Sequence, residues 1–275
     1  MRGVVSAGMV WALEDLGLLG IFDAVYGASA GAINAAYFLA GQAGLGTSIY
    51  YEDINNRTFI DLARLWRRQP VLNLDYLLTD VMVRRKPLDF DRVVRSPTPF
   101  SIIATDVDRE RTQVFDRFSD AKDLAGALRA SATMPIVAGG PSVYHGRRYL
   151  DASITEPIPL PTAEGGGHTH ILVLLTRGGR MRAKPSALDR YFVGPRLRRI
   201  SPKLADRYLR RSEPYAAITG AIDAGIGPLG HAAVMGIRAD GPEISRLERR
   251  RDILEAGARR GYDAVVTRLG ATIAN

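Results

Sequence analysis

The most constraining feature of this sequence is a run of small residues around one serine, Gly27-Ala28-Ser29-Ala30-Gly31. The short apolar segment 21–26 before it predicts a buried strand, and the alanine-rich segment 32–43 after it predicts a buried helix. A chain passes from strand to helix within so few residues only through a sharp turn, which small residues permit. We therefore expect Ser29 at the tip of a strained strand-to-helix turn, with its hydroxyl lifted above the sheet.

Apolar runs and helical patterns recur along the rest of the chain and predict an α/β fold. Residues 171–175 form a continuous apolar run, which is typical of a strand buried on both faces of a parallel sheet. Alternating strands and helices indicate a three-layer α/β/α architecture with a mostly parallel central sheet. The other expected strands are 101–105, 112–115, 149–150 and 232–237, and the expected helices are 10–19, 121–132 and one that follows the last strand through Glu255.

The chain is expected to form one catalytic core over residues 1–165, with a helical insertion at about 47–100 that prolines punctuate. Residues 166–275 are expected to be the C-terminal part of the same domain, including a basic helical segment at about 177–215. No internal repeat is visible. A core of this size is within reach of a chain of 275 residues.

Composition excludes several kinds of chemistry. Hydrophobic residues make up 46% and charged residues 24% of the chain, as in folded soluble proteins. The chain has no cysteine, which excludes disulfides, a thiolate nucleophile and a cysteine-ligated zinc site. His168 and His170 lack an accompanying acidic cluster and are interpreted as a polar loop, so we expect no metal and no cofactor. The net charge of +8 favours anionic partners.

The apolar start of the chain resembles a signal peptide, but Glu14 and Asp15 interrupt it before Leu16. No run of about 20 apolar residues occurs, so neither a secretion signal nor a transmembrane helix is expected. We expect a cytoplasmic protein that can lie at the periphery of a membrane.

A nucleophilic serine needs a base. A Ser, Asp, His order is formally available through His168, His170 or His231, but only 28 residues precede Ser29, whereas the α/β-hydrolase triad fold places several strands before its nucleophile. The remaining candidate is Asp151, which ends an apolar strand and opens a loop. A partly buried carboxylate at that sheet edge can take the serine proton. The alternatives are structural, with Ser29 as a helix cap and Asp151 in an ordinary Asx turn.

These motifs resemble those of the patatin-like phospholipase family. Met1-Arg2-Gly3 is similar to the end of its G-G-G-x-R-G loop, Gly27 to Gly31 to its G-x-S-x-G turn, and Asp151-Ala152-Ser153 to its D-G-G or D-G-A motif. The likeness extends over roughly residues 2–159 and includes the stretches 103–106 and 130–135.

The resemblance implies a Ser-Asp dyad that hydrolyses a phospholipid or another lipid acyl ester. Ser29 would be the nucleophile and Asp151 the general base, and a water molecule would later release the fatty acid. Backbone N–H groups near Arg2 and Gly3 would hold the oxyanion. The small residues Gly27, Ala28, Ala30 and Gly31 would shape the turn, and Ala152 and Ser153 would form the aspartate loop.

Two departures from the family pattern bear on activity. Ala152 stands where the family has glycine, and the three leading glycines of the first loop are absent. The resemblance also implies a central strand that leads into this loop, so we expect the working enzyme to carry such a strand ahead of Met1. The alternative function is a catalytically impaired patatin-like domain that binds lipid or a partner protein.

A basic amphipathic segment follows in the C-terminal part. Its pattern is that of a helix resting on an anionic membrane surface, and the alternative is a solvated helix face. No nucleic-acid-binding motif accompanies the basic charge, so no nucleic-acid partner is expected. The segment interleaves Arg196, Arg198, Arg199, Lys203, Arg207, Arg210 and Arg211 with Leu197, Ile200, Leu204, Tyr208 and Leu209.

Overall fold

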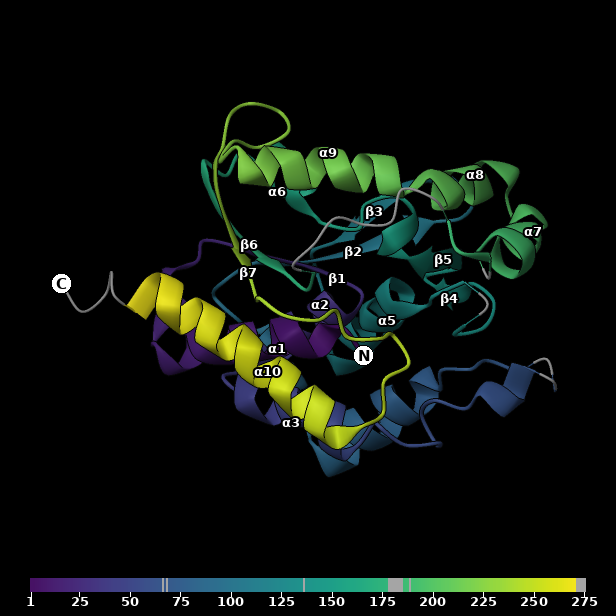
Figure 1. The fold of residues 1–275 in the computed structure, drawn as a ribbon, viewed down its shortest axis with the longest axis horizontal. Helices are drawn as coiled ribbons and strands as arrows, with labels where there is room; N and C mark the ends of the chain where they lie inside the picture. The colour runs from purple at the N-terminus through teal and green to yellow at the C-terminus, as the bar shows by residue number, and fades with distance from the viewer. Residues whose placement is uncertain (66, 68, 136, 178–184, 188, 271–275) are drawn as a thin grey trace.

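The computed structural model describes residues 1–65, 67, 69–135, 137–177, 185–187 and 189–270. In these residues, strands lie between two layers of helices (Figure 1), and the predicted α/β fold is confirmed. One layer contains α1 (Gly3–Asp15), α2 (Ala30–Leu39), α3 (Ala43–Glu52) and α10 (Arg251–Val265), and the other contains α6 (Leu160–Gly165) and α9 (Ser212–Asp223).

The larger sheet has the strand order β1-β2-β5-β4, with β3 also paired to β2. Strands β1 and β2 are parallel, whereas β3, β4 and β5 add antiparallel ladders. A second sheet pairs β6 and β7 in parallel. The strands are β1 (Val25–Ala28), β2 (Phe100–Asp106), β3 (Arg111–Phe115), β4 (Ser142–Tyr144), β5 (Arg147–Asp151), β6 (His170–Leu175) and β7 (Ala233–Arg238).

A cleft of about 880 Å³ separates the two sheets and is lined by β1 on one side and β6 on the other. At its first end, the hydroxyl of Tyr26 lies 3.1 Å from Nε2 of His168, just before β6. At its second end, Gly3 packs on Ala30, just after β1. Arg2 and Arg177, the latter just after β6, share the carboxylate of Glu243. Strands β1 and β6 therefore run in the same direction, and no described strand lies between them.

Helix α1 differs most from its expected bounds, because it begins at Gly3 and not near residue 10. Its residues are buried on nearly every side, so it lacks the polar stripe that marks a surface helix. A Cβ built on Gly8 would lie 1.9 Å from the carbonyl oxygen of Ala258, and one on Gly261 would lie 2.0 Å from that of Val5. Helices α1 and α10 therefore touch backbone to backbone, which only glycine allows at these positions.

Other bounds were displaced by smaller amounts. The strand expected over 21–26 begins at Val25, because Leu18–Ile21 forms a 3₁₀ turn (η1) with Ile21 exposed. The strands expected at 101–105, 112–115, 171–175 and 232–237 and the helix at 121–132 agree with β2, β3, β6, β7 and α5 (Ala121–Ala132), whereas β4 was not predicted. The helix expected through Glu255 continues to Val265 as α10.

Shorter helical elements complete the fold. Segment 47–100 holds the end of α3, a 3₁₀ turn, a helix of π type and α4, and the basic segment holds α7 and α8. Within the described residues, no helix has the length and apolar character needed to cross a bilayer. These elements are η2 (Leu62–Leu65), η3 (Tyr76–Arg85), α4 (Phe90–Val94), η4 (Ala152–Ile154), η5 (Asp189–Val193), α7 (Gly194–Arg198), α8 (Pro202–Arg210) and η6 (Val266–Gly270).

Candidate active site

Ser29 lies at the tip of the turn between β1 and α2, where the sequence places it. Its backbone has φ of 54° and ψ of −126°, a conformation that residues with a side chain rarely adopt. Such strain costs of order 1–3 kcal/mol and persists only when the surroundings impose it. The turn thus has the geometry of a nucleophile elbow, and Ser29 lines the cleft between the sheets.

Gly27 and Gly31 have different surroundings. A Cβ on Gly27 would lie 2.5 Å from Cα and 2.9 Å from the backbone nitrogen of Ala32, so helix α2 leaves no room for a side chain there. A Cβ on Gly31 would meet no atom within 4 Å. The close approach of strand and helix therefore requires the first glycine of the motif, whereas the space beside the second is open.

Ser131 fixes the elbow through a hydrogen bond, a role that the sequence did not predict. The Ser29 N–H donates to Oγ of Ser131 at 2.8 Å, and that hydroxyl donates to the carbonyl oxygen of Ile103 at 2.6 Å. Ser131 is fully buried near the end of α5. One hydroxyl therefore joins the elbow to β2 and α5, and the only sequence signal for it was a serine among alanines in a helix.

Asp151 is the last residue of β5 and is 1% exposed. Its Oδ1 accepts the Ser153 N–H at 2.8 Å, which is the Asx turn that the sequence left open as an alternative. Its Oδ2 is buried and has no hydrogen-bond partner among the described residues. A buried, unpaired carboxylate oxygen costs about 1–3 kcal/mol or more, so a donor supplied to Oδ2 would be stabilising.

The strand register brings Ser29 and Asp151 to the same edge of β2. Ala28 is opposite Ile103 in the parallel ladder, and Asp151 is opposite Ala104 in the antiparallel ladder. Residues 104–106 pair with both β3 and β5, so these two strands lie on opposite edges of β2, and β1, which overlaps β3 at Ile102 and Ile103, shares the edge of β5. The carboxyl ends of β1 and β5 therefore meet at successive positions of β2, which places Ser29 and Asp151 at adjoining strand ends.

The start of α1 supplies backbone donors near Ser29. A Cβ on Gly3 would lie 2.7 Å from that of Ala30, so the first turn of α1 touches the residue after Ser29. The N–H groups of Arg2 and Gly3 have no hydrogen-bond partner among the described residues, because Val4 and Val5 make the first bonds of the helix. Free N–H groups at a helix start stabilise negative charge.

The four histidines contact residues other than Ser29, although His168 and His170 line the same cleft. His168 contacts Tyr26, His145 contacts Asp123, and His170 contacts Thr169. All four lie in described residues, and none hydrogen-bonds to Ser29 or Asp151. In the described chain, no three His, Cys, Asp or Glu side chains are grouped so as to hold a metal ion.

The cleft beside Ser29 is apolar over most of its wall and basic at one end. Leu13, Phe22, Phe38, Ile158 and Leu172 line it. At the end where α1 begins, the lining changes to Arg2, Arg177, Arg211 and Arg246.

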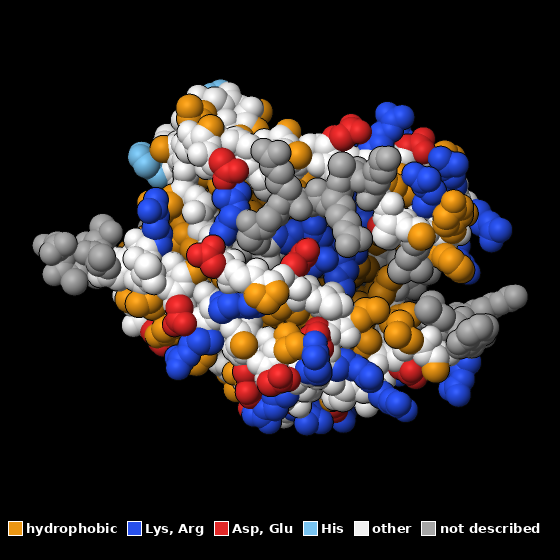
Figure 2. Space-filling view, viewed as in Figure 1, with side chains coloured by type: hydrophobic (Ala, Val, Ile, Leu, Met, Phe, Trp, Pro, Cys, Tyr) orange, Lys and Arg blue, Asp and Glu red, His pale blue; other side chains and the backbone are white. Residues whose placement is uncertain are grey.

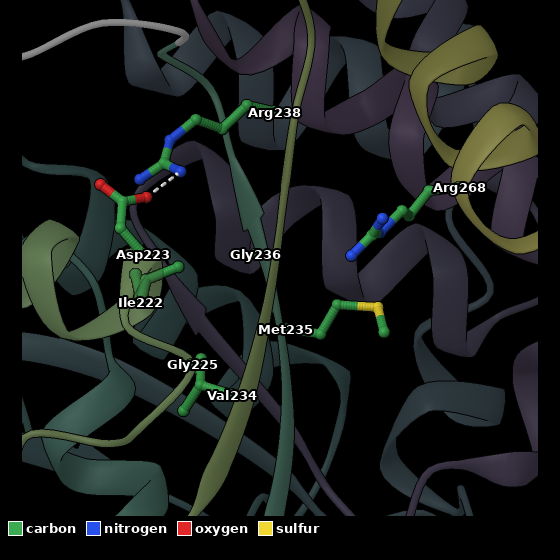
Figure 3. A pocket seen from close by; sticks show the side chains of 8 residues that line it. All are labelled: Ile222, Asp223, Gly225, Val234, Met235, Gly236, Arg238 and Arg268. Carbon is green, nitrogen blue, oxygen red and sulfur yellow. Dashed lines mark hydrogen bonds and ion pairs between the residues drawn. The ribbon is translucent and has the colours of Figure 1, made fainter.

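A smaller cavity of about 310 Å³ lies against β7 (Figure 3). Arg238 forms an ion pair there with Asp223, while Arg268 lies on the other side of β7 near Met235. Ser29 lines the larger cleft and does not line this cavity, whereas Asp151 lines neither. The larger cleft is therefore the candidate active site.

Comparison with known proteins agrees with the fold. The family model described as patatin-like phospholipase matches residues 1–164, more than half of the chain, so the chain belongs to this family. The chain is also similar to the uncharacterized protein YjjU of Escherichia coli strain K12, at 26% identity over 194 residues. That match covers 69% of this chain and 53% of the relative, so the chain spans about half the length of the curated relative it matches.

Proposed function

We propose that this member of the patatin-like phospholipase family is a lipid acyl hydrolase that works through Ser29 and Asp151. The observation that carries the proposal is the strained Ser29 elbow at an apolar cleft, with the unpaired Oδ2 of Asp151 at the adjoining end of β5. The family supports a hydrolase that acts on lipids.

The reaction is acyl transfer in two halves. Oδ2 of Asp151 accepts the Ser29 proton while Oγ attacks the acyl carbonyl, and the proton then passes to the departing alcohol. Water, deprotonated by Asp151, attacks the acyl-enzyme, and the fatty acid leaves as Ser29 recovers its proton. The free N–H groups of Arg2 and Gly3 hold the oxyanion in both halves, at about 3 kcal/mol for each donor.

The departure at Ala152 does not weaken this proposal. Ala152 begins η4, and its φ is not positive, so a methyl group creates no backbone strain there. The competing function, an impaired domain that binds lipid or protein, then rests on the first loop alone, where Met1-Arg2-Gly3 lacks the leading glycines of the family.

Covalent labelling by a fluorophosphonate probe tests the proposal. We expect the wild-type protein and Ser48→Ala to be labelled and Ser29→Ala to be unlabelled. Ser48 lies in α3 and hydrogen-bonds to Leu45 and Glu52 of its own helix, so it is a matched serine control. Ser29→Ala and Asp151→Asn should each lower the hydrolysis of a nitrophenyl ester by on the order of 10³-fold or more, because nucleophile and base act as a unit.

Appreciable turnover by either variant would refute the dyad. A histidine triad would be reinstated if alanine at His168, His170 or His231 abolished activity in a protein that still folds. Unlabelled wild-type protein that binds lipid would instead favour the impaired domain.

A further inference from the structure

Four arginines meet at the end of the cleft where α1 begins. Arg2 precedes α1, Arg177 follows β6, Arg211 lies between α8 and α9, and Arg246 lies between β7 and α10. All four line the same cavity as Ser29. Figure 2 shows Lys and Arg side chains gathered in a hollow near the middle of one face of the molecule.

These four arginines have few negative partners. Arg2 and Arg177 share one carboxylate, with Nε atoms 2.8 and 3.3 Å from Oε1 of Glu243. Arg211 pairs with Asp189 at 2.8 Å. Among the described residues, the Arg246 side chain has neither a hydrogen bond nor an ion pair. The ion pairs of the described chain thus give four guanidinium groups only two carboxylates.

Burial makes this imbalance costly. The side chains of Arg2 and Arg177 are 23% and 13% exposed. Burial, together with repulsion from Arg177 and Arg246, lowers the pKa of Arg2 to about 10. Burial likewise lowers the pKa of Arg177, against the opposing attraction of Glu243. A bound anion would relieve both effects, and its attraction to the arginines is stronger in a half-buried site than in water.

Resting on the proposed function, we infer that Arg177 and Arg246 form a subsite for a phosphate group on the lipid ester whose carbonyl meets Ser29. Guanidinium groups bind phosphate oxygens in a two-pronged geometry. The surplus of two positive charges matches a phosphate monoester, which carries about −1.5 to −2 charges at pH 7. Arg2 precedes Gly3, and Gly3 touches Ala30, the residue after Ser29. The arginine cluster therefore lies near the position of the reacting carbonyl.

The arginine cluster should discriminate among lipid headgroups. An acylated glycerol phosphate places a dianion in the arginine cluster, whereas a neutral acylglycerol leaves the cluster unpaired. A choline headgroup brings a cation toward the arginines, which weakens its binding. The preferred substrate is therefore an acyl ester of glycerol phosphate, ahead of zwitterionic and neutral esters with the same acyl chain.

The test compares 1-acylglycerol 3-phosphate with the neutral 1-acylglycerol of the same chain length. We expect the wild-type kcat/KM to be at least about 10-fold higher for the phosphate ester, and Arg177→Gln and Arg246→Gln each to lower this preference about 10-fold through KM, the effect of one charge-assisted contact. Arg268→Gln, in the smaller cavity, is the matched control and should keep the wild-type preference. Thermal melting checks that each variant folds.

A second measurement separates the subsite from catalysis. Calorimetric titration of glycerol 3-phosphate into the full chain should show binding to wild type and to Ser29→Ala, and at least about 10-fold weaker binding to Arg246→Gln. If both esters are cleaved equally, or if folded Arg246→Gln binds glycerol phosphate as wild type does, the subsite is refuted while the hydrolase proposal stands. If neither ester is cleaved but glycerol phosphate binds as expected, the hydrolase proposal fails and the anion site stands.

Discussion

Ser29 adopts its strained backbone because two neighbours at different distances along the chain impose it. Gly27, two residues away, lets Ala32 of α2 approach the end of β1. Ser131, far along the chain, accepts the Ser29 N–H and fixes the turn from the other side. The local neighbour is written into the G-x-S-x-G pattern. The distant one belongs to the tertiary fold, which a single sequence does not display.

Replacement of Ser131 by alanine should loosen the elbow. The change removes the acceptor of the Ser29 N–H and the donor to the Ile103 carbonyl, both in a fully buried setting. We expect a loss of about 1–3 kcal/mol in the free energy of unfolding and slower fluorophosphonate labelling of Ser29. Thermal melting and labelling rate, with Ser48→Ala as control, measure the two effects. Wild-type values for both would show that the elbow does not depend on Ser131.

The arginine cluster illustrates a second limit of residue-scale prediction. The sequence shows an excess of basic residues but not that Arg177 and Arg246 would meet beside Arg2. They meet there because one corner of the cleft is formed by the end of β6, the segment after β7 and the start of α1. Of the basic residues that form the amphipathic pattern over 196–211, Arg211 lines this corner.

At the scale of elements, the basic amphipathic segment uses its apolar face inside the protein. Leu197, Leu204 and Tyr208 of α7 and α8 are at most 4% exposed and pack in one cluster with Leu150 of β5. Periodicity predicted such a face, but it does not say whether the face meets a membrane or the protein's own core. In the structure these apolar side chains are covered, so a contact with a membrane would depend on the charges of the segment.

We therefore predict that any vesicle binding by α7 and α8 is electrostatic. Arg199 and Arg210 are exposed, and replacing both with glutamine should weaken binding to anionic vesicles about 10- to 30-fold, at about 1 kcal/mol for each arginine near the surface. Arg211 is left intact because it pairs with the buried Asp189. Cosedimentation at rising salt concentration measures the effect, with Arg84→Gln and Arg95→Gln on other elements as the control pair.

Added salt should weaken the binding, since the Debye length falls to about 8 Å at physiological ionic strength. Equal binding to neutral vesicles, or an equal loss in the control pair, would contradict an electrostatic contact through α7 and α8.

At the scale of the whole molecule, the sheet is divided where a continuous sheet was expected. Apolar runs identify β6 and β7 as buried strands, but they do not specify which strands pair. The small sheet has its own core, in which Val173 and Val234 pack with Ile218 and Ile222 of α9. A central strand ahead of Met1 was expected from the resemblance, and the described residues place none between β1 and β6, whose facing edges line the cleft.

This division predicts an alternating pattern of hydrogen exchange along β6. The Ala233 N–H donates to the Thr169 carbonyl, and in a parallel ladder this fixes which β6 amides face β7. The Val173 N–H faces β7, whereas those of Leu172 and Leu174 face the cleft. We therefore expect the Leu172 and Leu174 amides to exchange at least about 10-fold faster than that of Val173, since they open to water without breaking the ladder.

Strand β2 is the internal control, because it pairs with β1 and β5 on one edge and with β3 on the other. The amides of Ile102 and Ile103 should therefore both exchange slowly, with no alternation. Hydrogen exchange followed by NMR resolves the individual amides. Equal protection of the Leu172 and Val173 amides would mean that a further chain segment covers the β6 edge in solution. The volume of the cleft beside Ser29 would then be smaller than the 880 Å³ between the two sheets.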